Sequence, residues 1–161
     1  MSLIVEGING VGKTTFCQEL LKLPRFKDYK YLHLTAQEDN TYSYYKNLLK
    51  DDKLVLDRGA LGELVYSSIY GRKPRITLSE VNKLFKEVNC YVLWTNDLNK
   101  IVKNLTSKGE QDSDECNLQW IRNEQQLFWK YIKRLRNVSI IPYDYQFMHK
   151  YCEVVRGLSL I

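Results

Sequence analysis

The chain has 161 residues, and its 24 lysines and arginines outnumber 19 aspartates and glutamates, which gives a formal net charge of +5. Hydrophobic residues make up 44% of the chain and charged residues 27%, which excludes a wholly disordered or collagen-like protein. The length fits one domain, so we expect residues 1–161 to form a single unit. No apolar run is long enough to cross a bilayer and MSLIVEG does not resemble a signal peptide, so we expect a cytoplasmic protein with no membrane partner.

The cysteines and the basic residues point to no metal or nucleic-acid site. The four cysteines are scattered without a C-x-x-C pair, which argues against zinc and disulfide frameworks, so we expect reduced thiols at Cys17, Cys90, Cys116 and Cys152. The densest basic stretch, residues 130–136, is better explained as an exposed helix face. We therefore expect small anionic ligands rather than a nucleic-acid partner, and the sequence leaves a homodimer open.

Short apolar runs alternate with segments of helical periodicity along the whole chain. They predict strands at residues 3–5, 29–34, 53–56, 90–94 and 138–141. The helices are expected at residues 16–23, 41–49, 61–69, 77–88, 98–105 and 119–135, with a short one at the C-terminus. Thr77 and Glu80 have the spacing of a capping box at the start of the fourth helix. Continuously apolar strands between helices indicate an α/β fold whose parallel sheet is covered on both faces.

A glycine-rich turn after the first strand carries the strongest functional signal. GINGVGKT, residues 7–14, matches the phosphate-binding loop pattern G-x-x-x-x-G-K-[ST] in full, between a strand and a helix. In such a loop the backbone N–H groups surround phosphates, the lysine reaches the β- and γ-phosphates, and the hydroxyl ligates Mg²⁺. We therefore predict that a nucleoside triphosphate binds at Gly7, Ile8, Asn9, Gly10, Val11, Gly12, Lys13, Thr14 and Thr15.

Asp57 and Arg58 directly follow the third strand, at the carboxyl edge of the sheet, where ligands bind in open α/β folds. An aspartate there can hold the water shell of Mg²⁺, and an arginine can neutralise charge on a moving phosphoryl group. An ion pair in a surface turn would also place these two residues together, but the phosphate-binding loop favours catalysis. We predict Lys13, Asp57 and Arg58 as catalytic residues, with Thr14 and Asp57 at the metal.

Two segments, VEGINGVGKTT and LDRGALGELVYSSIYGR, resemble the thymidylate kinase-like branch of the P-loop kinases. The chain looks closest to the short deoxynucleoside monophosphate kinases of bacteriophages, and the resemblance extends from the first strand to about residue 135. It implies a P-loop kinase fold with a small lid, ATP as phosphoryl donor and Mg²⁺ as cofactor. It also implies a role in deoxynucleotide biosynthesis in a bacterial cytoplasm.

The same resemblance implies roles for residues of the acceptor side. Arg58 would bridge the donor and acceptor phosphates, and Tyr66 would line the acceptor pocket. Glu63 and Arg72 are further pocket candidates, although an exposed helix surface would also explain both. SKGE, residues 107–110, resembles the family's lid, which we expect at about 106–117 with Lys108 as its catalytic cation.

Three departures from the family pattern concern the acceptor. Many thymidylate kinases have an acidic residue where this chain has Asn9. The family's arginine after the second strand, which grips the acceptor phosphate, has no match in HLTAQE, residues 33–38. The lid contains Lys108 but no arginine. These departures leave room for a related enzyme with a different acceptor preference.

The leading interpretation is transfer of a phosphoryl group from ATP to a deoxynucleoside monophosphate. The nearest alternative is a deoxynucleoside kinase, which would need a base for the sugar hydroxyl, and Glu38 could supply one. A nucleotide-dependent switch or NTPase is a second alternative, although the sequence contains no Asn-Lys-x-Asp motif. A kinase of polynucleotide ends is a third, and it would bind single strands with strong salt dependence.

Overall fold

The computed structural model describes residues 1–109 and 117–143. Within these residues, α-helices alternate with parallel strands, and one short 3₁₀ helix, η1 (Pro24–Phe26), follows the first α-helix. The strands are β1 (Leu3–Glu6), β2 (Lys30–His33), β3 (Leu54–Asp57), β4 (Asn89–Trp94) and β5 (Val138–Pro142). The α-helices are α1 (Lys13–Leu21), α2 (Tyr42–Leu48), α3 (Ala60–Ile69), α4 (Leu78–Leu84), α5 (Leu98–Ser107) and α6 (Leu118–Ile132).

The five strands form one parallel sheet of order β2-β3-β1-β4-β5. β1 is the central strand, and all four residues of β1 and of β3 are buried. Such continuous burial requires cover on both faces of the sheet. Because the strands are parallel, their carboxyl ends meet at one edge, where His33 on β2 lies in register with Asp57 on β3.

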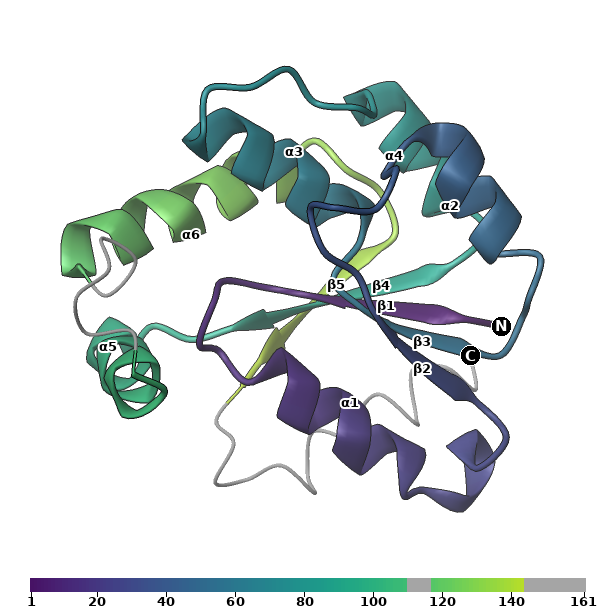
Figure 1. The fold of residues 1–161 in the computed structure, drawn as a ribbon, viewed down its shortest axis with the longest axis horizontal. Helices are drawn as coiled ribbons and strands as arrows, with labels where there is room; N and C mark the ends of the chain where they lie inside the picture. The colour runs from purple at the N-terminus through teal and green to yellow at the C-terminus, as the bar shows by residue number, and fades with distance from the viewer. Residues whose placement is uncertain (110–116, 144–161) are drawn as a thin grey trace.

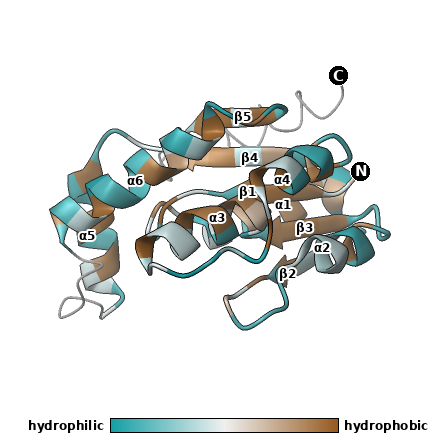
Figure 2. Cartoon of the chain, turned by 90° about the horizontal axis from the view of Figure 1, so that it is seen from above, coloured by the Kyte–Doolittle hydropathy of each residue, from teal (hydrophilic) through white to brown (hydrophobic). Residues whose placement is uncertain are grey.

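Helices cover the two faces unequally (Figure 1). Helix α1 lies on one face, and α2, α3, α4 and α6 lie on the other, while α5 stands beyond the carboxyl edge. The central strands are mostly apolar, whereas the helices carry many hydrophilic residues (Figure 2). The core therefore lies in two layers, one on each face of the sheet.

The α/β fold and its five parallel strands are as predicted from the sequence, and the helices lie within a few residues of their expected positions. Helix α6 ends at Ile132 rather than at residue 135, because the Leu135 N–H bonds to the Ile132 carbonyl and tightens the chain into a turn before β5. Only one half of the capping box at α4 forms. The Thr77 hydroxyl accepts the Glu80 N–H, but the Glu80 carboxylate accepts from this same hydroxyl instead of from the Thr77 backbone N–H. The short C-terminal helix expected from the sequence lies outside the described residues.

Cys17 and Cys90 are buried in the core, as expected for structural cysteines. Cys116 and Cys152 lie outside the described residues. In the described ranges, 1–109 and 117–143, no helix is long and apolar enough to span a bilayer.

Candidate active site

The phosphate-binding loop adopts the backbone conformation that its glycines permit. Gly10 and Gly12 have φ angles of 81° and 103°, in the region that side-chain-bearing residues rarely adopt. A Cβ at Gly12 would lie 2.8 Å from the Tyr143 ring, and one at Gly10 would lie 3.0 Å from Leu105. The loop is thus packed between α5 and the residue that follows β5. Both the backbone conformation and the limited space require glycine at positions 10 and 12.

Lys13 is buried at the start of α1, and its ammonium donates to the carbonyls of Gly7 and Ile8 at 2.8 Å each. Burial and, to a smaller extent, the nearby Arg58 lower the pKa of Lys13 to about 8, although Asp57 and neighbouring glutamates oppose the shift. The side chain lies folded on the loop. A phosphate in the loop would replace the carbonyls as its partner.

Asp57, at the end of β3, is fully buried, and three donors converge on its Oδ2. Thr14 Oγ1 lies at 2.6 Å, the Tyr31 hydroxyl at 2.7 Å and His33 Nδ1 at 3.1 Å. Burial raises the pKa of Asp57, but these hydrogen bonds outweigh burial and hold the pKa below its usual value. Asp57 is therefore ionised at neutral pH, with one oxygen fixed in place.

The second oxygen of Asp57 fits a metal ligand. Asp57 Oδ1 is buried and accepts no hydrogen bond from the residues that the structure describes. It belongs to the same carboxylate that holds the Thr14 hydroxyl, so a hydroxyl and a free carboxylate oxygen lie together beside the loop. The described ranges contain no group of three or more His, Cys, Asp or Glu side chains suited to a metal. Mg²⁺ needs no such group, because it is commonly held by one or two protein oxygens together with substrate phosphates and waters.

Arg58 follows Asp57 and lines the cavity beside the phosphate-binding loop. Its φ of 74° is unusual for a residue with a side chain, and such backbone strain concentrates at functional sites. Its Nη2 donates to Asn9 Oδ1 at 3.0 Å. Its Nε is buried and has no hydrogen-bond partner in residues 1–109 and 117–143. An anion beside Asn9 would satisfy this donor.

Glu6 lies beneath the site, fully buried, and accepts the Gly62 N–H at 3.0 Å. Burial raises the pKa of Glu6 to about 7, although the Gly62 hydrogen bond, Lys13 and Arg58 all oppose the shift. Its carboxylate binds the first turn of α3 to the strand before the loop. Glu6 thus helps to fix the position of α3 relative to β1.

Glu124 on α6 is a functional candidate that the sequence interpretation missed. It is 1% exposed, and its Oε1 accepts the Asn9 N–H at 2.8 Å and the Tyr66 hydroxyl at 2.6 Å. One carboxylate therefore joins the phosphate-binding loop to α3. A signal for it exists in the sequence, since Glu124 occupies a position in the buried stripe of Ile121 and Phe128, where an apolar residue is expected.

Glu63 is held between two arginines of the loop after α3. Arg72 donates to the two Glu63 oxygens at 2.7 and 3.1 Å. Arg75 donates to them through its backbone N–H and through its Nη2, both at 3.0 Å. Burial alone would raise the pKa of Glu63, but the arginine hydrogen bonds outweigh it and lower the pKa to about 2. Arg75 also donates to the carbonyls of Ala36 and Glu38. It was not among the residues predicted from the sequence.

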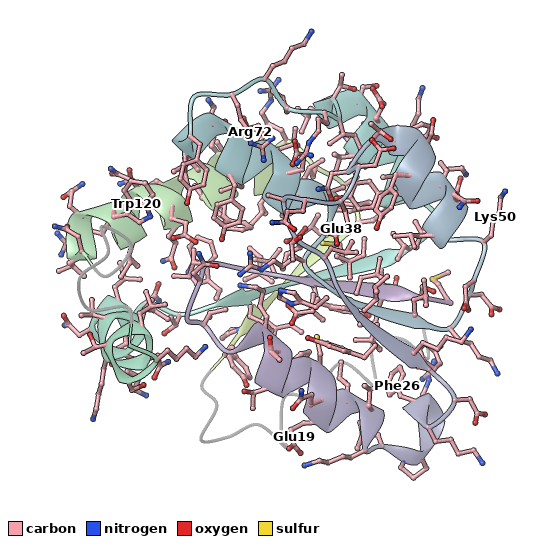
Figure 3. The ribbon with its side chains drawn as sticks, in the orientation of Figure 1. Glu19, Phe26, Glu38, Lys50, Arg72 and Trp120 are labelled. Atoms are coloured by element: carbon pink, nitrogen blue, oxygen red, sulfur yellow. The ribbon has the colours of Figure 1, made fainter. Side chains whose placement is uncertain are left out.

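A cavity of about 370 Å³ opens where these groups meet. It is lined by residues of the loop, of the segment after β2, of α3 and the loop after it, and of α5: Asn9, Gly10, Leu34, Thr35, Ala36, Asn40, Arg58, Gly59, Gly62, Glu63, Tyr66, Tyr70, Arg72, Leu105 and Lys108. Figure 3 shows Arg72 beside α3 and Glu38 between α3 and the sheet. Every acceptor residue predicted from the sequence thus lies on this cavity.

The remaining predicted residues lie on or near the loop. Ile8 and Val11 point their side chains into the core, and Thr15 is exposed in the first turn of α1. Lys108, just after α5, is exposed and lines the cavity. Helix α5 itself is fastened to the loop, because the Asn104 amide donates to the Gly10 carbonyl at 2.9 Å. Most of the expected lid, residues 110–116, lies outside the described residues.

Comparison with known proteins identifies the fold. No protein-family model matches the sequence, and no curated protein is significantly similar to it. The YorR protein of Bacillus subtilis, solved with phosphorylated GDP, has a TM-score of 0.79 at 15% identity, over 99% of this chain and 95% of that one. Deoxyadenosine kinase from M. mycoides, solved with dCMP and dCDP, has a TM-score of 0.62 at 15% identity over 100% of both chains. Shikimate kinase from Acinetobacter baumannii, solved with shikimate, has a TM-score of 0.65 at 10% identity, over 99% and 92%. The chain has the fold of the P-loop kinases.

Proposed function

We propose that this chain is a kinase that transfers the γ-phosphoryl group of ATP to a nucleoside monophosphate, and that its natural acceptors are deoxynucleotides. One observation carries the proposal: Asn9 and Gly10 of the phosphate-binding loop line the same cavity as Arg58 and Tyr66. Its volume of about 370 Å³ falls in the range of small-molecule sites. A hydrolase would need room only for water beside the loop, so a nucleotide-sized cavity there supports transfer to a second substrate.

The donor side would hold the phosphates and the metal. Lys13 and the loop N–H groups would bind the β- and γ-phosphates, and the N-terminus of α1 would add to the attraction. Thr14 Oγ1 and Asp57 Oδ1 would hold Mg²⁺ and its waters. Bound Mg²⁺ would neutralise charge on the phosphates.

Arg58 would act between the two substrates. Arg58 lines the cavity and its Nη2 donates to Asn9 of the phosphate-binding loop, so its guanidinium lies where an acceptor phosphate would approach the loop. Phosphoryl transfer depends mostly on position and on neutralising charge, and an arginine at this point supplies both. Lys108 at the cavity rim would add a cation and help to exclude water from the transferred group.

The chain's own contacts favour a monophosphate over a free nucleoside as acceptor. A nucleoside hydroxyl needs a base, and Glu38 is the candidate from the sequence. Its carboxylate instead binds Thr35, through the backbone N–H and through the hydroxyl at 2.6 Å, and hydrogen bonds to Thr35 lower its pKa. A monophosphate already carries the attacking anion and needs no base.

The test is a coupled ADP-release assay with Mg-ATP against a panel of nucleoside and deoxynucleoside monophosphates and the matching free nucleosides. We expect turnover with monophosphates, and a loss of about 100-fold or more in the Arg58→Ala variant. Lys46→Ala is the matched control, since Lys46 is a surface cation on α2 that pairs with the exposed Glu87 and does not line the cavity. Turnover with nucleosides alone would replace the proposal by a nucleoside kinase, and silence on the whole panel would overturn it.

A further inference from the structure

The end of the cavity away from the phosphate-binding loop is built around Glu63. Six hydrogen bonds reach its two oxygens, from Arg72, Arg75 and Ser67. A carboxylate offers about four lone-pair positions, so Glu63 has none left for a ligand. Glu63 lines the cavity, but its role there is to fix the plane of the Arg72 guanidinium.

Five other acceptor oxygens of the cavity residues each already receive a hydrogen bond. The oxygens involved belong to side chains and to carbonyls, and each receives a hydrogen bond from within the chain: Asn9 Oδ1, Gly10 O, Thr35 O, Ala36 O and Asn40 Oδ1. A ligand group that donates hydrogen bonds therefore has to share these oxygens with donors of the chain.

Donors, in contrast, remain available. Arg72 gives two of its N–H groups to Glu63 and keeps the others. The Arg58 guanidinium also lines the cavity, and the exposed Lys108 lines it from the end of α5. The cavity thus offers a ligand mainly N–H donors and positive charge.

Helix α3 orders these donors along the ligand. Arg58 precedes its first turn, while Tyr66 and Tyr70 line the cavity on later turns. An acceptor whose phosphate lies at Arg58 therefore extends along α3 and brings its base toward Tyr66 and Arg72. The base edge meets a guanidinium that Glu63 holds in one orientation.

We propose that Arg72, held by Glu63, selects acceptor nucleotides whose base presents a carbonyl oxygen at this end of the cavity. This inference rests on the proposed function, because it assumes a nucleotide in the cavity. Guanine, hypoxanthine, uracil and thymine place an oxygen where the guanidinium donates, as arginine does when it reads guanine in nucleic acids. Adenine and cytosine place an amino group at that position, so that two donors face each other without partners.

The test compares pairs of ligands that differ in one exocyclic group and in whether the adjacent ring nitrogen carries hydrogen. Deoxyinosine and deoxyadenosine monophosphates differ by oxygen against an amino group at purine position 6, and deoxyuridine and deoxycytidine monophosphates differ likewise at pyrimidine position 4. Binding is measured by calorimetry without ATP, so phosphoryl transfer is not needed. We expect the oxygen-bearing member to bind about ten- to hundredfold more tightly in at least one pair. Equal binding within both pairs, or tighter binding of the amino members, would overturn the inference.

Variants separate base reading from a structural role. Arg72→Gln should bring the two members of the selective pair within about twofold of each other, mainly by weakening the oxygen-bearing one. Arg75→Lys is the matched control, because Arg75 also binds Glu63 but does not line the cavity. It should change both members alike and leave their ratio intact. A collapse of the ratio in Arg75→Lys as well would overturn the inference, since Arg72 would then act only through the cluster.

The inference and the proposed function fail in different ways. Binding without selectivity, together with phosphoryl transfer to monophosphates, would contradict only the inference. Selective binding without any transfer would contradict the kinase proposal and leave the base-reading role of Arg72 standing. No binding of any monophosphate would overturn both.

Discussion

The two halves of the site are built in different ways. The phosphate-binding loop is one continuous segment between β1 and α1, whereas the acceptor cavity is assembled from the segment after β2, α3, the loop after α3, and α5. The phosphate-binding residues of the loop are neighbours in the sequence, so the site requires glycine, lysine and a hydroxyl residue in a fixed order. The cavity acts through pairs of distant residues, such as Arg75 with Ala36 and Glu124 with Asn9. Phosphate binding is therefore a local property of the chain, and acceptor choice is a tertiary one.

Replacing Lys13 tests the local half most severely. Lys13→Met should lower kcat about 1,000-fold, because no other ammonium reaches the loop carbonyls in the described residues. The fold should survive, because the Lys13 ammonium donates to two loop carbonyls and the buried Asp57 keeps its hydrogen bonds from Thr14, Tyr31 and His33. Steady-state kinetics and thermal unfolding check both points. Unchanged kcat in a folded variant would contradict the assigned role.

Asp57→Asn should lower kcat about 100-fold and raise the Mg²⁺ concentration needed for half-maximal rate. The amide would present N–H groups to Thr14, Tyr31 and His33, or to the metal, where an oxygen is required. The matched control is Asp51→Asn, since Asp51 is an aspartate at the opposite end of β3 that pairs with Lys30. Kinetics at varied Mg²⁺ measure the effect. Equal Mg²⁺ dependence in wild type and Asp57→Asn would argue against metal binding.

Glu124→Ala should weaken the contact between the phosphate-binding loop and the acceptor cavity. It leaves the Asn9 N–H and the Tyr66 hydroxyl without their shared acceptor, so we expect the free energy of unfolding to fall by about 2–3 kcal/mol. The KM values for ATP and for the acceptor should rise together, because the phosphate-binding loop loses the hydrogen bond at Asn9 and the cavity loses the one at Tyr66. Urea unfolding and two-substrate kinetics give the readouts. Glu87→Ala, which removes an exposed glutamate, should change stability by less than about 0.5 kcal/mol. An equally small effect of Glu124→Ala would contradict the joining role.

The pH dependence of ATP binding offers a smaller and subtler test. The pKa of Lys13 is about 8 in the empty loop, and bound phosphates would raise it by stabilising the charged form. Affinity should then be full below pH 8 and fall roughly tenfold between pH 7 and pH 9, as the ammonium loses its proton. Calorimetry in buffers of different ionisation enthalpy should detect proton uptake near pH 8. Affinity that stays constant to pH 9 would contradict this account.

Local sequence patterns predicted the elements because the relevant forces act over a few residues. Apolar runs marked all five strands, Pro24 and the Thr77 cap marked helix boundaries, and the loop motif marked the phosphate site. Glu63, Tyr66 and Arg72 came from a family resemblance, and all three lie on the cavity. What they bind remains a prediction.

The residues that sequence reasoning missed act across the fold. No local sequence pattern marks His33, and only the register of β2 with β3 places it beside Asp57. Tyr31 lies two residues earlier on the same strand and reaches the same oxygen. Arg75 follows Pro74 in a loop without periodicity, so no local pattern marks it. Glu124 alone left a readable sign, as a carboxylate in an apolar stripe.

The central claim is that both halves serve one reaction, and ³¹P NMR tests it most directly. The protein is incubated with Mg-ATP and a deoxynucleoside monophosphate that binds it, and all phosphorus-containing products are followed in one sample. We predict that ADP and the deoxynucleoside diphosphate appear in equal amounts, with little inorganic phosphate. ADP and inorganic phosphate without a diphosphate of the acceptor would contradict the claim, because the loop would then work without the cavity.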